Sequence, residues 1–208
     1  MPVSPRTAVP TDPLRLFVAV ELPAAVKDAL ASTIAALRAA GDDDILRYVR
    51  VDGVHLTLKF LGAVNASRVG AIDAALRNVL AGAASCELQS GGLGSFGGTR
   101  ALRVVWLGIA GDTGTLAALA ERVESALTPL GFPHETRSFA AHLTLARVRD
   151  GASPADRARI HALIEQVVAP LAPSFRVESV SLMQSAIGRG GAVYHALHHY
   201  PLTDRPPS

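Results

Sequence analysis

The sequence has few of the residues that mark exported, disulfide-bonded or thiolate-metal proteins. Its 208 residues include a single cysteine, Cys86, which excludes an internal disulfide and a metal site built from several thiolates. No stretch approaches the roughly 18 consecutive apolar residues that a membrane-spanning helix needs. Residues 1–13 contain four prolines and lack the apolar centre of a secretory signal. We therefore expect a soluble protein that is located in the cytoplasm and binds no membrane.

A strong excess of charge of one sign is also lacking, because 20 basic residues face 18 acidic residues and the net charge is +2. This balance is too even to draw the whole molecule toward nucleic acid. Lysine occurs only at positions 27 and 59, so 20 − 2 = 18 of the basic residues are arginines, whose planar guanidinium groups suit phosphate. A general preference for arginine accounts for this excess, and only a local cluster would indicate a phosphate site.

The chain does contain enough apolar residues for a folded core, since 49% of its residues are hydrophobic and 18% are charged. A length of 208 residues is compatible with one large domain or two closely packed lobes. We expect residues 1–13 to form a flexible tail and residues 14–208 to form a single domain with two lobes.

Hydrophobic periodicity and turn residues predict alternating strands and helices. Many of the strands are joined by short connections, which favours an α+β fold with antiparallel sheets over a doubly wound parallel sheet. A glycine-rich loop is expected after residue 89. The predicted strands are at residues 14–20, 46–51, 54–61, 86–89, 102–109, 140–148, 175–185 and 192–200, and the predicted helices are at about residues 21–41, 67–80, 112–131 and 153–168.

One tetrapeptide, His-Leu-Thr-Leu, occurs at residues 55–58 and again at residues 142–145, each time on a predicted strand. Alternate residues of a strand share a face, so each copy presents a histidine and a threonine on one face and buries two leucines on the other. The copies are 142 − 55 = 87 residues apart. We interpret them as equivalent parts of a duplicated, bilobal architecture in which two antiparallel sheets face a central cleft and the helices lie outside.

Two facing histidines can serve as base and acid at the two ends of one displacement at phosphorus. Their ordinary pKa of about 6.5 lets one ring be neutral and accept a proton while the other is charged and donates one. The neighbouring threonine hydroxyls can donate hydrogen bonds to the non-bridging oxygens, where charge grows in the transition state. Such a site needs no nucleophilic side chain and no metal ion.

The contexts of the two motifs, HLTLKFLG and HLTLARV, resemble the two-histidine (2H) phosphoesterase superfamily. The segments RLFVAVELP, GLGSF and LGFPHETRSF are similar to its bacterial RNA 2′,3′-cyclic phosphodiesterase branch, also called the 2′-5′ RNA ligase family. The resemblance covers roughly residues 14–202. It implies a V-shaped cleft and an enzyme that hydrolyses the terminal 2′,3′-cyclic phosphate of RNA or a nucleotide to a 2′-phosphate.

The resemblance implies that His55 and His142 are the catalytic pair. In this assignment His142 takes a proton from the attacking water and His55 gives one to the departing ribose oxygen. Thr57 and Thr144 are the corresponding substrate-binding hydroxyls.

The resemblance implies two further substrate contacts, Arg147 with the phosphate and Phe17 near the base of the terminal nucleotide. This chain departs from the family at three positions that shape the approach to the histidines. Ala141 stands where proline is common, and Tyr48 and Val51 replace a common tryptophan and proline. These departures put the substrate preference in question more than the chemistry.

Strict alternation along the two strands makes separate predictions for their ends. Lys59 shares the parity of His55, but a lysine at the end of a strand is usually solvated, so we place it outside the site. Arg147 has the parity opposite to that of His142, so alternation alone points it away from the cleft.

A metal site is the alternative interpretation of the histidines at positions 195, 198 and 199. Alternation separates His198 from the other two, and no carboxylate lies close in sequence. We therefore expect no metal and no cofactor.

The expected function is that of a monomeric phosphodiesterase acting on RNA or nucleotides with 2′,3′-cyclic phosphate ends. Two alternatives stay open. The same site could make or cleave 2′-5′ linkages, or the protein could bind RNA ends without turnover. The intact second motif argues against a binding module, because a binder needs no acid and base.

Overall fold

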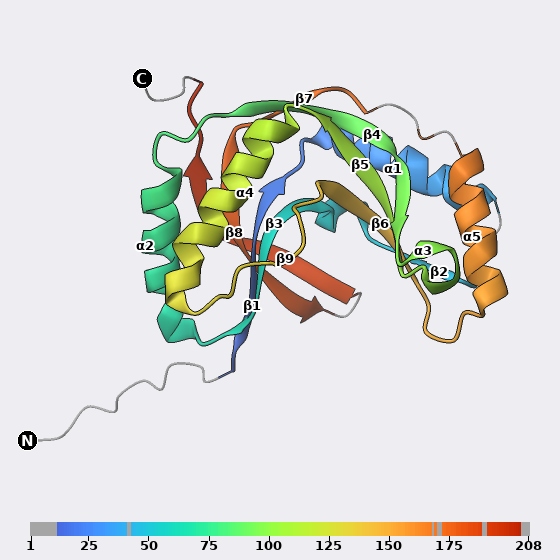
Figure 1. The fold of residues 1–208 in the computed structure, drawn as a ribbon, viewed down its shortest axis with the longest axis horizontal. Helices are drawn as coiled ribbons and strands as arrows, with labels where there is room; N and C mark the ends of the chain where they lie inside the picture. Colours follow the sequence, from blue (N-terminus) through green and yellow to red (C-terminus); the bar gives the residue numbers. More distant parts are fainter. Residues whose placement is uncertain (1–11, 41–42, 168, 170–171, 189–190, 205–208) are drawn as a thin grey trace, which may run out of the picture.

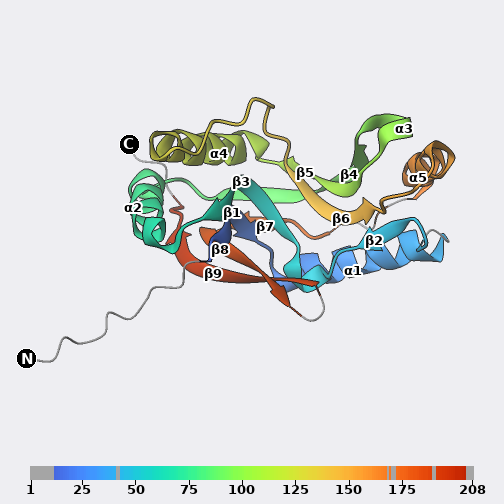
Figure 2. The ribbon, with the colours of Figure 1, turned by 90° about the horizontal axis from the view of Figure 1, so that it is seen from below.

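The computed structural model describes residues 12–40, 43–167, 169, 172–188 and 191–204, so residues 1–11 of the expected tail lie outside the described residues. The described strands form antiparallel pairs in two sheets (Figures 1 and 2). In chain order they are β1 (Leu14–Glu21), β2 (Leu46–Tyr48), β3 (His55–Val64), β4 (Cys86–Phe96), β5 (Val104–Gly111), β6 (His142–Val148), β7 (Phe175–Val177), β8 (Ser179–Gly188) and β9 (Gly191–Pro201).

The order of the strands confirms the duplicated architecture. One sheet has the order β3-β1-β8-β9 and the other the order β2-β6-β5-β4-β7. In each sheet the motif-bearing strand, β3 or β6, pairs with the strand that opens its half of the chain, β1 or β5. The next strand, β8 or β4, follows the helix after the motif of the other half. The two halves therefore exchange strands, and each sheet is completed by both.

The helices of the described residues lie at the two ends of the molecule (Figure 1). They are α1 (Ala24–Ala39), α2 (Val69–Leu80), the short α3 (Gly98–Ala101), α4 (Thr113–Leu127) and α5 (Pro154–Gln166), with 3₁₀ turns at Val51–Gly53, Ala66–Arg68 and Thr128–Leu130. α2 and α4 pack together beside the four-stranded sheet, and α1 and α5 lie beside the five-stranded sheet. The predicted start of α5 is confirmed, because Ser153 and Asp156 form a capping box there. None of these helices is long and apolar enough to cross a bilayer.

The glycine-rich segment after residue 89 is not the loop expected from the sequence, because β4 continues through it to Phe96. Glycines lower the strand propensity of a segment, but pairing with β5 resumes at Leu93 after an irregularity and overrides that preference. A chain turn follows at Gly97, whose φ of 108° suits glycine alone.

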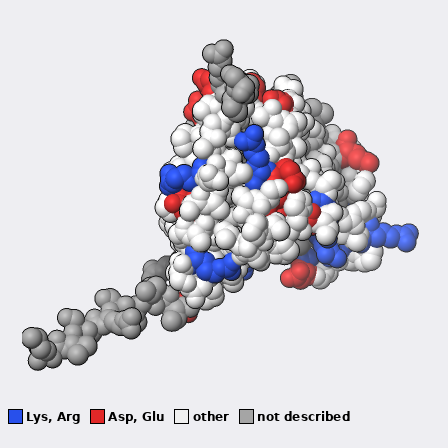
Figure 3. Space-filling model, turned by 60° about the vertical axis from the view of Figure 1, so that its left-hand side comes forward, with Lys and Arg blue, Asp and Glu red and all other residues white. Residues whose placement is uncertain are grey.

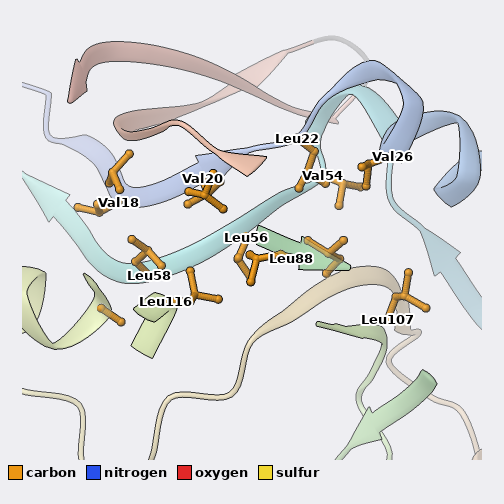
Figure 4. Close-up of a cluster of buried hydrophobic side chains, with 14 of the residues drawn as sticks. Val18, Val20, Leu22, Val26, Val54, Leu56, Leu58, Leu88, Leu107 and Leu116 are labelled. Carbon is orange, nitrogen blue, oxygen red and sulfur yellow. The ribbon is translucent and has the colours of Figure 1, made fainter. Parts of the chain in front are cut away.

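The hydrophobic core joins residues of both sheets in one cluster. Figure 4 shows Leu56 and Leu58 of β3 near Leu88 of β4 and Leu116 of α4, with Leu107 of β5 in another part of the same cluster. Leu56, Leu88 and Leu107 are at most 1% exposed. Complete burial of a leucine side chain contributes about 1.5–3 kcal/mol, so this cluster firmly fixes the leucine side of β3.

Candidate active site

The two His-Leu-Thr-Leu motifs lie on neighbouring strands of different sheets. β3 and β6 contact each other near the middle of the molecule (Figure 2), although the motifs are far apart in the sequence. Both leucines of each copy are buried, and the histidines and threonines are half-buried on the opposite side of their strands. The predicted division of each motif into an apolar and a polar face is therefore confirmed.

Both imidazoles are held by the same local hydrogen bond. Nδ1 of His55 lies 2.8 Å from the carbonyl oxygen of Gly53, and Nδ1 of His142 lies 2.7 Å from that of Ala140. A carbonyl oxygen only accepts, so Nδ1 carries the hydrogen in both rings. The free lone pair of each neutral ring is thus on Nε2, which is the atom that can accept a proton from substrate or water or, once protonated, donate one.

Aromatic rings pack against the imidazole of His55. The ring of Phe17 stacks on it with centroids 4.5 Å apart, and Tyr194 of β9 meets it edge-on at 4.9 Å. Phe17 is only 3% exposed, so it supports the imidazole from the side of the protein interior. Gly53 leaves room for Tyr194, because a Cβ there would lie 2.9 Å from the tyrosine ring.

A different pair of aromatic rings surrounds His142. Phe96 of β4 meets the imidazole edge-on at 4.8 Å, and Trp106 of β5 lies 6.4 Å away. The indole covers β4 closely, since a Cβ on Gly94 would lie 2.2 Å from it. Gly94 therefore belongs to the support of the second motif, and the glycine-rich strand has a packing reason.

Each motif ends in a β-bulge at its second leucine. In the β1–β3 pair Ala19 is opposite Thr57 and Val18 is opposite Lys59, so Leu58 is an extra residue. In the β5–β6 pair Trp106 is opposite Thr144 and Val105 is opposite Ala146, so Leu145 is extra in the same way. A bulge inserts one residue and inverts the alternation beyond it.

The bulges overturn both predictions that assumed strict alternation. Lys59 does not share the face of His55 and is not solvated, because it is 5% exposed and its Nζ forms an ion pair with Glu124 of α4. Alternation alone predicted that Arg147 points away from the cleft, but the bulge places it on the face of His142. Its cross-strand partner on β5, the half-buried Val104, lies on the same face. At the equivalent place on β3 is Phe60, which is 71% exposed.

Burial and one carboxylate act on His55 in opposite directions. Burial is the larger influence and lowers the pKa of this histidine below its ordinary value. The bond to Gly53 and the charge of Glu21, its cross-strand partner, both raise the pKa. Glu21 accepts a 2.7 Å hydrogen bond from the Ser181 hydroxyl and lies 3.4 Å from Nδ1 of His199. A lowered pKa makes the neutral form of His55 more populated and its protonated form a stronger acid.

Other residues that could carry chemistry stand apart from this arrangement. Within the described ranges, no group of three or more histidine, cysteine, aspartate or glutamate side chains is arranged to hold a metal ion. His198 lies 3.4 Å from Asp73, whereas His199 lies near Glu21. Burial raises the pKa of Cys86 to about 11, so its thiol stays protonated at neutral pH and is a poor nucleophile.

Comparison with known proteins agrees with this geometry. The family model of the 2′-5′ RNA ligase superfamily matches residues 26–189. The chain belongs to the 2′-5′ RNA ligase superfamily.

Two relatives in this superfamily match over nearly their whole length. The protein named RNA 2′,3′-cyclic phosphodiesterase from Methanothermobacter thermautotrophicus is 31% identical over 181 residues, which are 87% of this chain and 95% of the relative. The protein of the same name from Escherichia coli K12 is 30% identical over 197 residues, 93% of this chain and 99% of the relative. The crystal structure of E. coli LigT complexed with 3′-AMP superposes with a TM-score of 0.71 at 29% identity, covering 92% of this chain and 99% of that one.

Sequence reasoning missed several residues that surround the histidines in this member of the superfamily. Tyr194, Phe96 and Trp106 contact the imidazoles, and Glu21 is the cross-strand partner of His55. Aromatic residues make up only 5% of the chain, and half of the ten gather around the two motifs when Phe17 and Phe60 are included. No local signal in the sequence indicates this clustering, because Tyr194 and Trp106 are far along the chain from the motif that each contacts.

Proposed function

We propose that this protein is an RNA 2′,3′-cyclic phosphodiesterase in which His55 and His142 act as acid and base. The observation that carries this proposal is the matched pair of Nδ1–carbonyl bonds, because they leave Nε2 free for proton transfer on both rings. The function named for the relatives, RNA 2′,3′-cyclic phosphodiesterase, supports the substrate class.

The reaction follows from in-line attack at phosphorus. Nε2 of His142 removes a proton from water while the water oxygen bonds to phosphorus. The bond from phosphorus to the ribose O3′ breaks, and Nε2–H of protonated His55 gives its proton to that oxygen. The product is a 2′-phosphate with a free 3′-hydroxyl, and the hydroxyls of Thr57 and Thr144 donate to the non-bridging oxygens throughout.

The remaining predicted residues have roles that fit their places. Arg147 shares the face of His142 and is proposed to contact the phosphate. Phe17 is proposed to hold His55 in position and to approach the terminal base by its edge. Phe60 is proposed to offer that base an exposed stacking surface beside Phe17. The centroids of the two phenyl rings are 6.2 Å apart. A monomeric state and a cytoplasmic location stay predictions.

Product analysis tests the function directly. A 2′,3′-cyclic mononucleotide is incubated with the protein and followed by phosphorus NMR, with and without EDTA. We expect a single 2′-phosphate product at the same rate in both samples, because the proposed mechanism uses no metal. Tight binding without product would make the protein an RNA-end binding module, and loss of turnover in EDTA that a divalent ion restores would contradict the mechanism.

The superfamily description favours 2′-5′ linkages as a second substrate class at the same site. Comparison of kcat/KM for an oligonucleotide with a cyclic end and for one with an internal 2′-5′ bond separates the two. We expect the cyclic end to be preferred. Its five-membered ring is strained, and the ring already holds the leaving O3′ on the phosphorus in a fixed position. The opposite preference would make 2′-5′ chemistry the main activity.

A further inference from the structure

An arginine-lined hollow lies where β5 begins and β6 ends, next to α5. Its volume is about 620 Å³ and eight residues line it. Five of the eight are arginines and one is an acid, Asp150. The arginines are Arg47, Arg103, Arg147, Arg149 and Arg157. A quarter of the 20 basic residues of the chain is therefore concentrated in one place, which is the local cluster that the overall charge did not reveal.

The hollow continues the face that carries His142. The bulge at Leu145 places Arg147 on this face, and Arg47 of β2 is the cross-strand partner of Arg147. Cross-strand partners point to the same side of a sheet. Arg147 is five residues beyond His142, so their Cα atoms are about 16 Å apart at 3.3 Å per residue of extended strand. The long Arg147 side chain bridges part of this separation toward a phosphate held at the histidines.

In the part of the chain that the structure describes, the guanidinium groups of the hollow form no ion pair with a carboxylate. Among the described residues no ion pair is found for Arg47, Arg103 or Arg147. The side chains of Arg149 and Arg157 donate to backbone carbonyl oxygens, those of Asp43 and of Ala152 and Leu102. Carbonyl contacts orient a guanidinium but leave its charge uncompensated.

Charges elsewhere are arranged differently. In Figure 3, basic and acidic residues are interspersed over the visible face. Arg77 of α2 is an example, since it pairs with Asp73 one helical turn away at 3.1 Å. Gathering five like charges opposes folding unless an anion shares the site, so the hollow has the character of an anion-binding site.

We propose that this hollow binds a backbone phosphate of the RNA chain upstream of the terminal cyclic nucleotide. The proposal rests on the proposed function for the identity of the chain. The terminal phosphate lies at the histidines, and the chain runs along β6 so that a phosphate more than one nucleotide away reaches Arg47 and Arg103. A mononucleotide held at the histidines reaches the near edge of the hollow at Arg147 but not Arg47 or Arg103, so these two arginines select RNA over free cyclic nucleotides.

The test compares substrates of two lengths in three variants. Arg47→Gln, Arg103→Gln and the matched control Arg122→Gln, an exposed arginine of α4, each remove one charge. We measure kcat/KM for a 2′,3′-cyclic mononucleotide and for an oligonucleotide with the same cyclic end. The ratio of the two values is expected to fall roughly three- to tenfold in each hollow variant and to stay constant in the control.

Binding provides a readout that does not depend on turnover. The affinity of the wild-type protein for an oligonucleotide with a 2′-phosphate end is measured at increasing salt. Each hollow variant should weaken binding and reduce the slope of log affinity against log salt by about 0.7. An unchanged ratio together with an unchanged salt slope would overturn the proposal, as would an equal loss for both substrates. If the wild-type protein does not hydrolyse the substrates but the salt slope still falls in the hollow variants, the result would count against the proposed function alone.

Discussion

The two His-Leu-Thr-Leu strands have the same backbone and different neighbours. Both end in a bulge at the second leucine, and both hold their histidine through Nδ1 on the carbonyl two residues earlier. Past the bulge, however, one strand exposes Phe60 and the other Arg147. Opposite the histidine, β1 supplies Glu21 where β5 supplies Gly108.

This contrast separates two tasks within one site. The shared backbone directs two Nε2 atoms, which is what an acid–base pair requires. The unshared neighbours give one wall a stacking surface and a carboxylate, and the other wall cationic groups. Duplication therefore accounts for the paired backbone that the proposed chemistry requires, and divergence after duplication accounts for the different neighbours of the two rings.

Loss of either histidine should have the largest effect. His55→Ala and His142→Ala are each expected to lower kcat/KM by at least about 10²-fold, since general acid–base catalysis contributes roughly 10²–10⁴. The double variant should lose much less than the product of the two, because both rings act on one step.

A substrate with an activated leaving group, such as a nitrophenyl phosphodiester, sharpens the comparison between the two rings. It needs no strong proton donor, so it should restore activity to His55→Ala far better than to His142→Ala. The reverse pattern would exchange the two roles. Near-normal activity of either single variant would remove the paired mechanism.

The threonines test whether the two copies share the stabilisation of charge. Thr57→Val and Thr144→Val keep the β-branched shape and remove the hydroxyl. Each should lower kcat by up to about 10²–10³-fold with little change in KM, because the lost hydrogen bond is strongest in the transition state. Steady-state kinetics on a cyclic mononucleotide measure this, and a raised KM with unchanged kcat would reduce the residue to a binding role.

The positions beyond the bulges should differ in what they recognise. Arg147→Gln is expected to raise KM by about tenfold for every cyclic nucleotide, because a charged contact to phosphate is lost. Phe60→Ala should raise KM by a factor that depends on the base and is largest for purines, which stack over a greater area. Kinetics with the four cyclic mononucleotides check both, and equal base dependence in the two variants would contradict the contrast between the walls.

The pH dependence should show the smallest and most specific differences. Because burial lowers the pKa of His55, one limb of the kcat/KM profile is expected below the ordinary histidine pKa of about 6.5. Glu21→Gln removes a charge that raises this pKa, so the limb should move to still lower pH. Tyr194→Ala admits water to the ring, so the limb should move to higher pH. NMR titration of the His55 ring follows the shift directly, and movement of both variants in one direction would refute this account.

Short-range features of the fold were readable from the sequence. The periodicity of α2, the capping box at Ser153 and the two buried leucines of each motif all depend on neighbours within a few residues, and the structure has them as expected. The wrong predictions concern positions whose orientation depends on how two strands pair. Lys59 and Arg147 were placed on the wrong faces because a bulge is a property of two paired strands and leaves no sign in one.

By itself the sequence determined that two identical His-x-Thr strands exist, that each has one apolar face, and that the chain forms an α+β fold of two halves. These follow from local pattern and from repetition. Only the tertiary structure decided that the aromatic rings of β1, β9, β4 and β5 surround the imidazoles, and that Arg47, Arg103 and Arg157 meet in one hollow. Such contacts join segments far apart in the chain, and they depend on strand register and sheet order, which the hydrophobic pattern of a single segment does not encode.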